Sequence, residues 1–203
     1  PVSVSQGADR LDYGYSSSGI LSGSGTGSDM ALGSAKTHSI QVNTSQIGPA
    51  TGSVDVLATS PQTASPTFTQ PVTMGVLGHA TGSFSPSSLI TTLDVDFGTL
   101  TQGTGAANQS FSIYNMPGAL GPDWTARLDL DAFNLSGSGL FSTTLSPFTN
   151  LPAGNSLGFG LSLSTTTVGL FEGSYLLSLS DEDLPGATNQ SLSINVRGSV
   201  VAP

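Results

Sequence analysis

The sequence predicts an all-β protein built from two sandwich domains in tandem, and three observations lead to this prediction. Ser, Thr and Gly are abundant, whereas Glu, Lys, Arg and Gln, which favour helices, are scarce. Apolar residues alternate with polar ones in short segments between turns rich in Gly, Pro and Asn, which is typical of strands with one buried face. The second half of the 203-residue chain also repeats the pattern of the first.

Alternation in the first half predicts five strands, at 1–6, 9–15, 39–43, 53–58 and 70–80. The Gly/Ser-rich stretch 16–34 is expected to be a loop or an irregular edge. Residues 60–66 contain two prolines and are expected to form a connection, because proline cannot donate to the hydrogen-bond ladder of a central strand. These elements define a first domain at 1–85, followed by a linker at 86–92.

The second domain, at 93–203, opens with two alternating segments around a Gly-Thr-Gly turn, and we expect a β-hairpin-like start there. Leu93, Val95 and Phe97 would lie on one face of its first strand, with Asp94 and Asp96 on the other. Further strands are expected at 126–133, 140–145, 156–164, 173–180 and 191–200. Seven short strands separated by turns are typical of an immunoglobulin-like sandwich. A closed barrel is the alternative.

The two halves match at a nearly constant offset. Residues 40–56 correspond to 161–177 at an offset of 121, and residues 70–78 correspond to 190–198 at an offset of 120. The segment LSGSG at 21–25 recurs at 135–139, and 2–6 corresponds to 111–115. Spacing that is kept through strand, turn and strand indicates an internal repeat.

The motifs of the second half also resemble those of a known family. VDFGTL at 95–100 is followed by QSFSIYN at 109–115, by Ala153-Gly154 and by a closing Val196-Arg-Gly198. In this arrangement the chain is similar to the choice-of-anchor D, or Hydin-type, immunoglobulin-like repeats of bacterial exported proteins, many of which carry a PEP-CTERM sorting tag. The resemblance covers nearly all of 93–203 and, without its opening, about 35–80. It implies an extracellular, non-catalytic β-sandwich with no active-site residues.

Composition excludes several classes of function. Four Lys and Arg residues stand against thirteen Asp and Glu, so no basic patch exists to bind phosphates, and nucleic acid is excluded as a partner. The absence of cysteine excludes a disulfide framework, a thiolate zinc site and a cysteine nucleophile. No apolar run approaches the roughly 20 residues of a membrane span, and no signal peptide is present, so an exported protein would be in its processed form.

The acidic triplet Asp181, Glu182 and Asp183 lies in the connection between two expected strands. Oxygen ligands at such a corner can hold Ca²⁺, so calcium is the one candidate cofactor, although the Asp-x-Asp-x-Asp-Gly spacing is absent. The alternative is a solvated acidic turn.

Two carboxylate pairs, Asp94/Asp96 and Asp129/Asp131, are expected on outward strand faces. Glycoside hydrolysis uses two carboxylates, but it also needs a cleft with aromatic platforms, and the single Trp124 lies in a turn. We therefore expect two solvated sheet faces.

The histidines, His38 and His79, lie at strand ends, and the chain has no Gly-x-Ser-x-Gly elbow. A Ser-His-Asp triad is therefore not expected. We expect no enzyme, but a structural protein of the bacterial cell surface or extracellular matrix. The alternative is an adhesin module that binds a carbohydrate or a surface partner through loop tips at Trp124 or at 181–183.

Residues 93–100 have no counterpart in the first half, so the first sandwich lacks its opening strand in this sequence. That strand lies upstream in the precursor, or a neighbouring copy donates it. Strand exchange of the second kind would produce a homo-oligomer or a filament. Val2 and Val4 would then lie at the polymer interface, and 191–201 is the main candidate donor strand.

Overall fold

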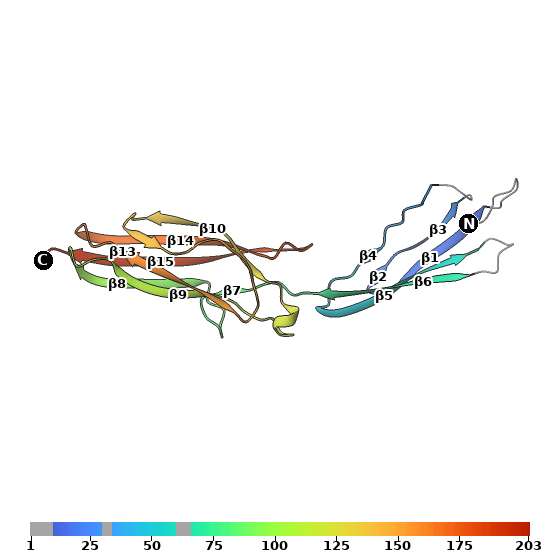
Figure 1. The fold of residues 1–203 in the computed structure, drawn as a ribbon, viewed down its shortest axis with the longest axis horizontal. Coiled ribbons are helices and arrows are strands. Elements are labelled where there is room, and N and C mark those ends of the chain that lie inside the picture. The colour runs from blue at the N-terminus through green and yellow to red at the C-terminus, as the bar shows by residue number, and fades with distance from the viewer. Residues whose placement is uncertain (1–9, 30–33, 60–65) are drawn as a thin grey trace. The chain divides into compact units, whose positions relative to one another are not determined.

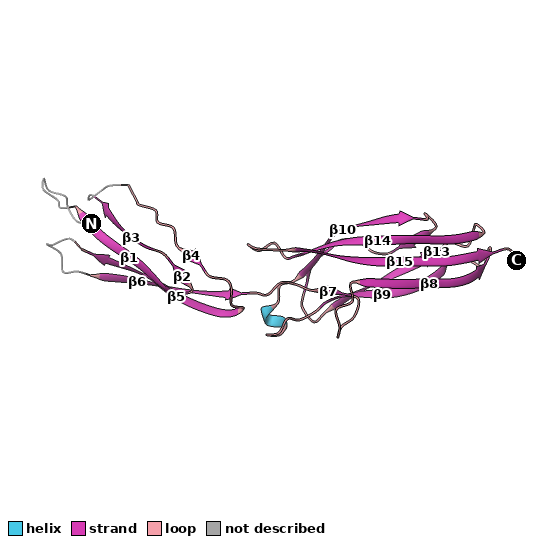
Figure 2. Cartoon of the chain, turned by 180° about the vertical axis from the view of Figure 1, so that it is seen from behind, coloured by secondary structure: helices cyan, strands magenta, loops and turns pink. Residues whose placement is uncertain are grey.

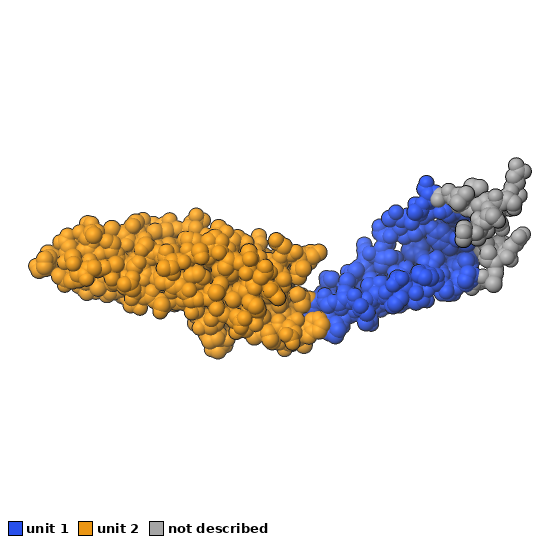
Figure 3. All heavy atoms as spheres, in the orientation of Figure 1, with its two compact units in different colours: residues 1–76 blue, residues 77–203 orange. Residues whose placement is uncertain are grey.

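The computed structural model describes residues 10–29, 34–59 and 66–203. Most of these residues lie in β-strands, and the one helical element among them is the 3-10 turn η1 (Pro122–Trp124). None of the described helical residues forms a helix long and apolar enough to cross a membrane. The chain divides into two compact units, Pro1–Val76 and Leu77–Pro203 (Figure 3). The prediction of an all-β sandwich fold is confirmed.

Unit 1 forms two antiparallel sheets (Figure 1). The larger sheet has the strand order β3-β1-β5-β6, and the smaller one pairs β2 with β4. The strands of its described residues are β1 (Leu11–Gly19), β2 (Leu21–Ser22), β3 (Ser24–Asp29), β4 (Gln41–Val42), β5 (Gly48–Ala58) and β6 (Thr67–Val76).

The described part of the Gly/Ser-rich stretch 16–34 contributes β2 and β3, and β3 is the edge strand of the larger sheet, so of the two expectations the loop is wrong and the segment lies at a sheet edge. In β3, Gly27 and Gly25 lie opposite Tyr13 and Tyr15 of β1. A side chain at either glycine would collide with the tyrosine ring opposite it. Glycine therefore lets the two rings lie across the neighbouring strand, and a search for alternating apolar residues misses such a strand.

Unit 2 is a sandwich of two larger sheets (Figures 1 and 2). One sheet has the order β12-β10-β14-β15-β8, and the other has the order β11-β13-β9-β7. The strands are β7 (Gly82–Ser83), β8 (Thr92–Thr101), β9 (Ala107–Asn115), β10 (Leu128–Gly137), β11 (Phe141–Thr143), β12 (Phe148–Leu151), β13 (Ser156–Leu163), β14 (Gly169–Asp181) and β15 (Asn189–Val201).

β8 and β9 do not form the expected hairpin. β8 pairs in parallel with β15, whereas β9 pairs with β13 in the other sheet. The turn between them carries the chain from one sheet to the other, and the Gly103 N–H donates to the carbonyl of Thr165 at 3.1 Å. The predicted faces of β8 are confirmed, because Phe97 is buried whereas Asp94 and Asp96 are exposed.

Apolar side chains from both sheets fill the interior of unit 2. Leu177 and Ile194 point inward from the five-stranded sheet, Ile113 and Leu163 point inward from the other, and all four are fully buried. Full burial of one such side chain stabilises a fold by roughly 1.5–3 kcal/mol. This core is therefore the main source of stability in unit 2.

The internal repeat is visible in the structure, because β10 to β15 recur in the order and pairing of β1 to β6. Gly19 ends β1 with a φ of +70°, and Gly137 ends the equivalent strand β10 with a φ of +100°. A Cβ at Gly19 would meet the backbone of Gly52, and a Cβ at Gly137 would meet that of Gly173. Gly52 and Gly173 are the residues matched at the offset of 121, so the structure confirms this part of the repeat.

β6 and β15 correspond at a different offset from the one predicted. Val54 pairs with Gln70, whereas its counterpart Tyr175 pairs with Ile194. Gln70 therefore takes the place of Ile194, which is 124 positions further on, and the predicted offset of 120 is wrong. The error of four residues is even and preserves the alternation of faces, so the sequence pattern alone could not reveal it.

The predicted match of 21–25 to 135–139 is also wrong. Leu21 pairs with Val42 in β4, and Phe141 pairs with Leu163 in the equivalent β13. Leu21 therefore corresponds to Phe141, and the LSGSG identity is a coincidence in a chain rich in Ser and Gly.

The boundary between the units lies after Val76, whereas the sequence placed a linker at 86–92. Residues 77–92 belong to unit 2, where β7 pairs with β9 and Ser83 is fully buried. The Ser83 hydroxyl donates to the carbonyl of Ser88 at 2.8 Å and accepts the N–H of Ile90 at 2.9 Å. The Ser-rich segment that predicted a linker therefore forms a compact loop, which these hydrogen bonds close.

Candidate functional site

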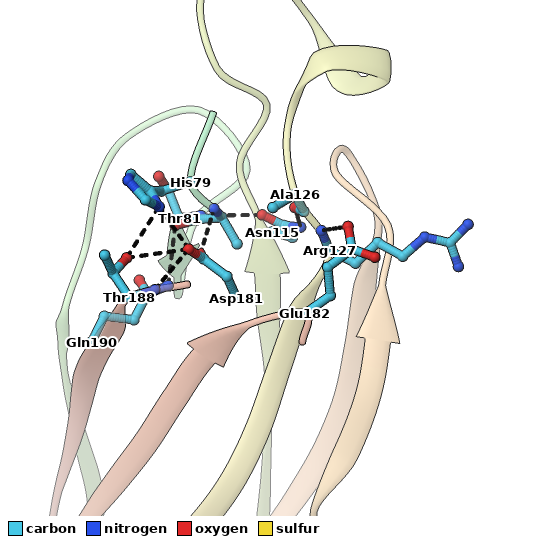
Figure 4. Close-up of polar contacts among 10 residues, drawn as sticks. His79, Thr81, Asn115, Ala126, Arg127, Asp181, Glu182, Thr188 and Gln190 are labelled. Atoms are coloured by element: carbon cyan, nitrogen blue, oxygen red, sulfur yellow. Dashed lines mark hydrogen bonds and ion pairs between the residues drawn. The ribbon is translucent and has the colours of Figure 1, made fainter. Parts of the chain in front are cut away.

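Asp181 is a buried carboxylate at the end of β14, and it ties the first residues of unit 2 to the turn before β15 (Figure 4). Its Oδ2 lies 2.6 Å from Nδ1 of His79 and accepts the N–H of Thr188 at 3.0 Å. Its Oδ1 accepts the N–H of Ala80 at 2.8 Å. These bonds compensate the carboxylate for the water it loses on burial.

The same contacts set the acidity of Asp181. Burial by itself raises the pKa of this carboxyl, but hydrogen bonds from His79, Thr188 and Ala80 outweigh burial and hold the pKa below its ordinary value. Asp181 is therefore a charged structural clip rather than a proton donor at neutral pH.

The three side chains of the acidic triplet are not grouped around a common point. Oε1 of Glu182 accepts the N–H of Arg127 at 3.0 Å (Figure 4), and Asp183 is exposed. No three His, Asp or Glu side chains in the described ranges are grouped so that they could hold a metal ion. The hypothesis of calcium at Asp181, Glu182 and Asp183 finds no supporting geometry, because two of the three carboxylates are engaged with protein N–H groups.

Asp94 and Asp96 join β8 to the neighbouring strand β15. Oδ1 of Asp94 accepts Nδ2 of Asn195 at 2.8 Å, and Oδ2 of Asp96 accepts Nε of Arg197 at 2.9 Å. The N–H of Gly98 also donates to Asp96, which lowers the pKa of this carboxyl. The pair lies on an exposed sheet face, as the alternation predicted, and it contacts the adjacent strand.

The second pair, Asp129 and Asp131, is divided between two environments. Asp129 is buried and accepts the N–H of Asn150, whereas Asp131 accepts the hydroxyl of Ser180 at 3.0 Å. The expectation of a solvated face is therefore wrong for Asp129. A shift in register between Leu130 and its neighbours interrupts the alternation of β10 at this point.

His38 and Trp124 also have structural contacts. His38 Nε2 lies 2.8 Å from the hydroxyl of Tyr13, and its ring centroid lies 4.4 Å from that of Tyr15. Trp124 is half-buried, and its carbonyl accepts the N–H of Gly78 at 2.8 Å. Trp124 is therefore not presented as an exposed aromatic platform at a loop tip.

Sequence reasoning missed Asn115, a buried amide that joins three segments of unit 2. Its Nδ2 donates to the carbonyl of Ala126 at 3.0 Å, and its Oδ1 accepts the N–H of Thr81 at 3.2 Å (Figure 4). Nδ2 also donates to the carbonyl of Leu151 at 3.0 Å. The available signal was a polar residue at an inward position, because Asn115 continues the alternation of Phe111 and Ile113.

The feature that sets unit 1 apart is the inner surface of its larger sheet. Val56 lies opposite Phe68, Gly52 opposite Val72 and Ala50 opposite Met74, and residues paired in this way share one face of an antiparallel sheet. We call this surface the open face and define it by five side chains: Val54, Val56, Phe68, Val72 and Met74.

Equivalent positions in unit 2 show that the open face is poorly covered. Phe68 is 63% exposed, whereas its counterpart Leu192 is 1% exposed. Val54 and Val56 are half-buried, whereas their counterparts Tyr175 and Leu177 are fully buried. Among the described residues, unit 1 therefore has the inner surface of a sandwich without a complete second sheet over it.

Two backbone edges border the open face. In the described part of unit 1, β5 lies beside β6 and no strand pairs with the other edge of β6, whereas the equivalent β15 pairs there with β8. Residues 35–40 correspond to 156–161, which pair with β9 in unit 2, but 35–40 lie outside any strand. The two edges correspond to different sheets of unit 2, so a strand added at either one would satisfy the backbone groups of that edge and cover apolar surface.

The sequence predicted polymer contacts at Val2 and Val4 and a donor strand at 191–201. Val2 and Val4 lie outside the described residues. The candidate donor, 191–201, lies within β15, which pairs with β14 on one side and β8 on the other and contributes Ile194 and Val196 to the core. This segment is therefore fixed in its own sandwich, and its assignment as donor is wrong.

No family model and no curated protein matches the chain. Among solved structures, it is similar to an ASH / PapD-like domain of human CEP192, with 9% identity and a TM-score of 0.43 over 54% of this chain and 82% of that one. It is also similar to CfaE, the adhesive subunit of CFA/I fimbria of enterotoxigenic Escherichia coli, with 11% identity and a TM-score of 0.41 over 95% and 74%. A third is WR4, a C. elegans MSP family member, with 11% identity and a TM-score of 0.33 over 50% and 92%. These similarities assign the chain to no family.

Proposed function

We propose that this chain is a non-enzymatic structural protein of the bacterial cell surface or extracellular matrix, and that its copies join into filaments by adding a strand to unit 1. The observation that carries the proposal is the contrast between the open face, where Phe68 is 63% exposed, and its fully covered counterpart in unit 2. Apolar surface and unpaired strand edges in water favour pairing with another chain.

The polar residues of unit 2 support a structural role. The carboxylates of Asp181, Asp94, Asp96 and Asp129 bond to groups on other strands or loops and so stabilise the sandwich. A chain with little charge and much Ser, Thr and Gly suits permanent exposure, and its motif resemblance to choice-of-anchor D repeats of PEP-CTERM-type exported proteins agrees with a location outside the cell.

The test is the size of the purified full chain over a hundredfold range of concentration, measured by light scattering and electron microscopy. We expect a series of head-to-tail oligomers that extends to filaments, because a heterologous contact does not close on itself. Phe68→Asp should shift the series to monomers, because it places a charge on the open face. Leu170→Asp, at a highly exposed position of unit 2, is the matched control and should leave the series unchanged. A monomer at all concentrations would contradict the proposal.

A further inference from the structure

We propose that Gln70 and Pro71 close the outer edge of β6, the edge that faces away from β5, against the addition of a strand. In the proposed filament, a second copy therefore joins unit 1 at its other open edge, beside residues 36–40. This step rests on the proposed function, since it names the edge that accepts the strand. The closure of β6 rests on the backbone and side chains of unit 1 alone.

The hydrogen bonds between β5 and β6 determine which backbone groups of β6 face outward. The Ala58 N–H donates to the carbonyl of Pro66 at 3.3 Å, and the register then continues without a shift as far as Val76. In an antiparallel pair, every second residue turns its N–H and C=O groups toward the partner strand. The even-numbered residues of β6 therefore face β5. The odd-numbered residues face outward, and they are Thr67, Thr69, Pro71, Thr73 and Gly75.

Pro71 lies in the middle of this outward-facing set and has no N–H to donate. The remaining group there is its C=O, which accepts Nε2 of Gln70 at 3.0 Å. A strand placed along β6 would therefore meet no donor at Pro71 and an acceptor that is already engaged. Proline with its nitrogen toward solvent is typical of edge strands that are protected from pairing.

The equivalent edge of unit 2 is occupied by a strand. Pro71 corresponds to Asn195 at the offset of 124, and β15 pairs there in parallel with β8, with Asn195 opposite Asp94. The Ser193 N–H donates to the carbonyl of Thr91 at 2.9 Å, so the odd-numbered residues of β15 turn their N–H groups toward β8. A proline in place of Asn195 would remove a hydrogen bond from the middle of this ladder.

The side chains of β15 that bind β8 also differ from those of β6. Asn195 and Arg197 donate to two aspartates of β8, at 2.8 and 2.9 Å. Their counterparts on β6 are Pro71 and Thr73, and neither carries the amide or the guanidinium group that makes these bonds. At these positions, both the backbone and the side chains of β6 are unsuited to holding a strand as β15 does.

The edge beside 36–40 is open in the same respects. Residues 34–43 contain no proline, and 34–39 are exposed. In unit 2, the Asn115 N–H donates to the carbonyl of Asn155, so the odd-numbered residues of β13 turn their backbone groups toward β9. Carried over at the offset of 121, residues 36, 38 and 40 offer their N–H and C=O groups to a strand in the place of β9.

Amide hydrogen exchange of the full chain, resolved by residue, tests the closure in oligomers and monomers separated by size. The N–H groups of Phe68 and Val72 face β5 and should exchange slowly in both fractions, which shows that β6 is folded. We expect the outward N–H groups of Thr69 and Thr73 to exchange fast in both. Slow exchange of these two in oligomers alone would overturn the inference, because a strand would then lie along β6, and it would still support the proposed function.

Opening the edge by substitution tests the closure even in a chain that stays monomeric. Gln70→Ile/Pro71→Asn places the residues of 194–195 in β6, so that it restores the outward donor and releases the outward acceptor. We expect two copies to pair through this edge, with slow exchange of Thr69 and Thr73 in the associated fraction. Association should begin at a concentration at least tenfold lower than in the wild type, or in the double variant alone if the wild type is monomeric.

Pro49→Asn is the matched control for the opened edge. Pro49 is an exposed strand proline like Pro71, but it lies in β5 opposite Gly75, and its nitrogen faces away from β6. This substitution also removes a proline from unit 1 without opening β6, and we expect it to associate as the wild type does. Equal association of the double variant and Pro49→Asn in light scattering would overturn the inference.

Discussion

The carboxylate of Asp181 shows how one residue can join segments that are far apart in the sequence. It binds His79 and Ala80, about a hundred residues earlier, and Thr188 in the following turn. Asp181→Asn keeps the shape but removes the charge, and we expect it to lower the free energy of unfolding of unit 2 by about 2–4 kcal/mol, since charged buried hydrogen bonds are strong.

The single Trp124 lies in unit 2, so its fluorescence during urea unfolding of the full chain reports on this unit. Asp183→Asn is the matched control, because Asp183 is exposed, and a change within about 0.5 kcal/mol is expected there. Equal effects of the two substitutions would show that the clip contributes nothing.

The acidity of Asp181 predicts a dependence on pH. Because the folded-state pKa lies below the ordinary value, the clip contributes stability at pH above about 4, the unfolded value, and loses it as pH falls through the folded pKa. The difference in unfolding free energy between the wild type and Asp181→Asn should therefore shrink as the pH falls below about 4. A difference that grows on acidification would contradict this assignment.

Tyr175 differs from Asp181, because its buried hydroxyl has no hydrogen-bond partner in unit 2. Burial raises the pKa of this phenol, so it stays neutral. Tyr175→Phe removes the unsatisfied group and should raise the unfolding free energy by about 1 kcal/mol or more. Tyr114→Phe, at a half-buried position, serves as the comparison, and a loss of stability in Tyr175→Phe would reveal a partner for the hydroxyl.

At the level of elements, alternation located most strands and their buried faces, because one buried side of a sheet requires a period of two. Alternation failed to predict a strand, or the partner of a strand, where contacts with distant residues determine it. β3 is a strand because two tyrosine rings lie over its glycines, and β8 pairs in parallel with a strand a hundred residues away. The four-residue error in matching β6 to β15 arose because an even shift leaves the alternation intact.

The glycine corner after β10, which both repeats share, can be tested by substitution. At Gly137, φ is +100° and an added Cβ would lie against the backbone of Gly173. Gly137→Ala should therefore destabilise unit 2 by at least about 2 kcal/mol, from backbone strain and the collision together. Gly139→Ala, where the structure leaves open space, should change stability by less than about 0.5 kcal/mol in the same urea titration. Comparable effects at the two positions would contradict the assigned corner.

At the scale of the whole chain, the sequence predicted two sandwiches and the incompleteness of the first, because the repeat left residues 93–100 without a counterpart. It did not predict the contacts of Asp181 or Asn115, since no local pattern relates groups separated by 30 to 100 residues. Nor could it identify the open face, because Val54 and Val72 have the same apolar character as the buried residues they match. Only their burial reveals the difference.

The measurement that tests the central claim most directly is amide hydrogen exchange at residues 34–40 and in β6, compared between oligomers and monomers separated by size. A strand donated beside 36–40 would pair with that edge only in the oligomer, so we predict slow exchange at 36–40 in oligomers and fast exchange in monomers. The free edge of β6 corresponds to the other sheet and serves as the comparison. The Val2→Asp/Val4→Asp variant should show fast exchange in every fraction. Slow exchange of 36–40 in wild-type monomers would contradict the claim that a second copy completes unit 1.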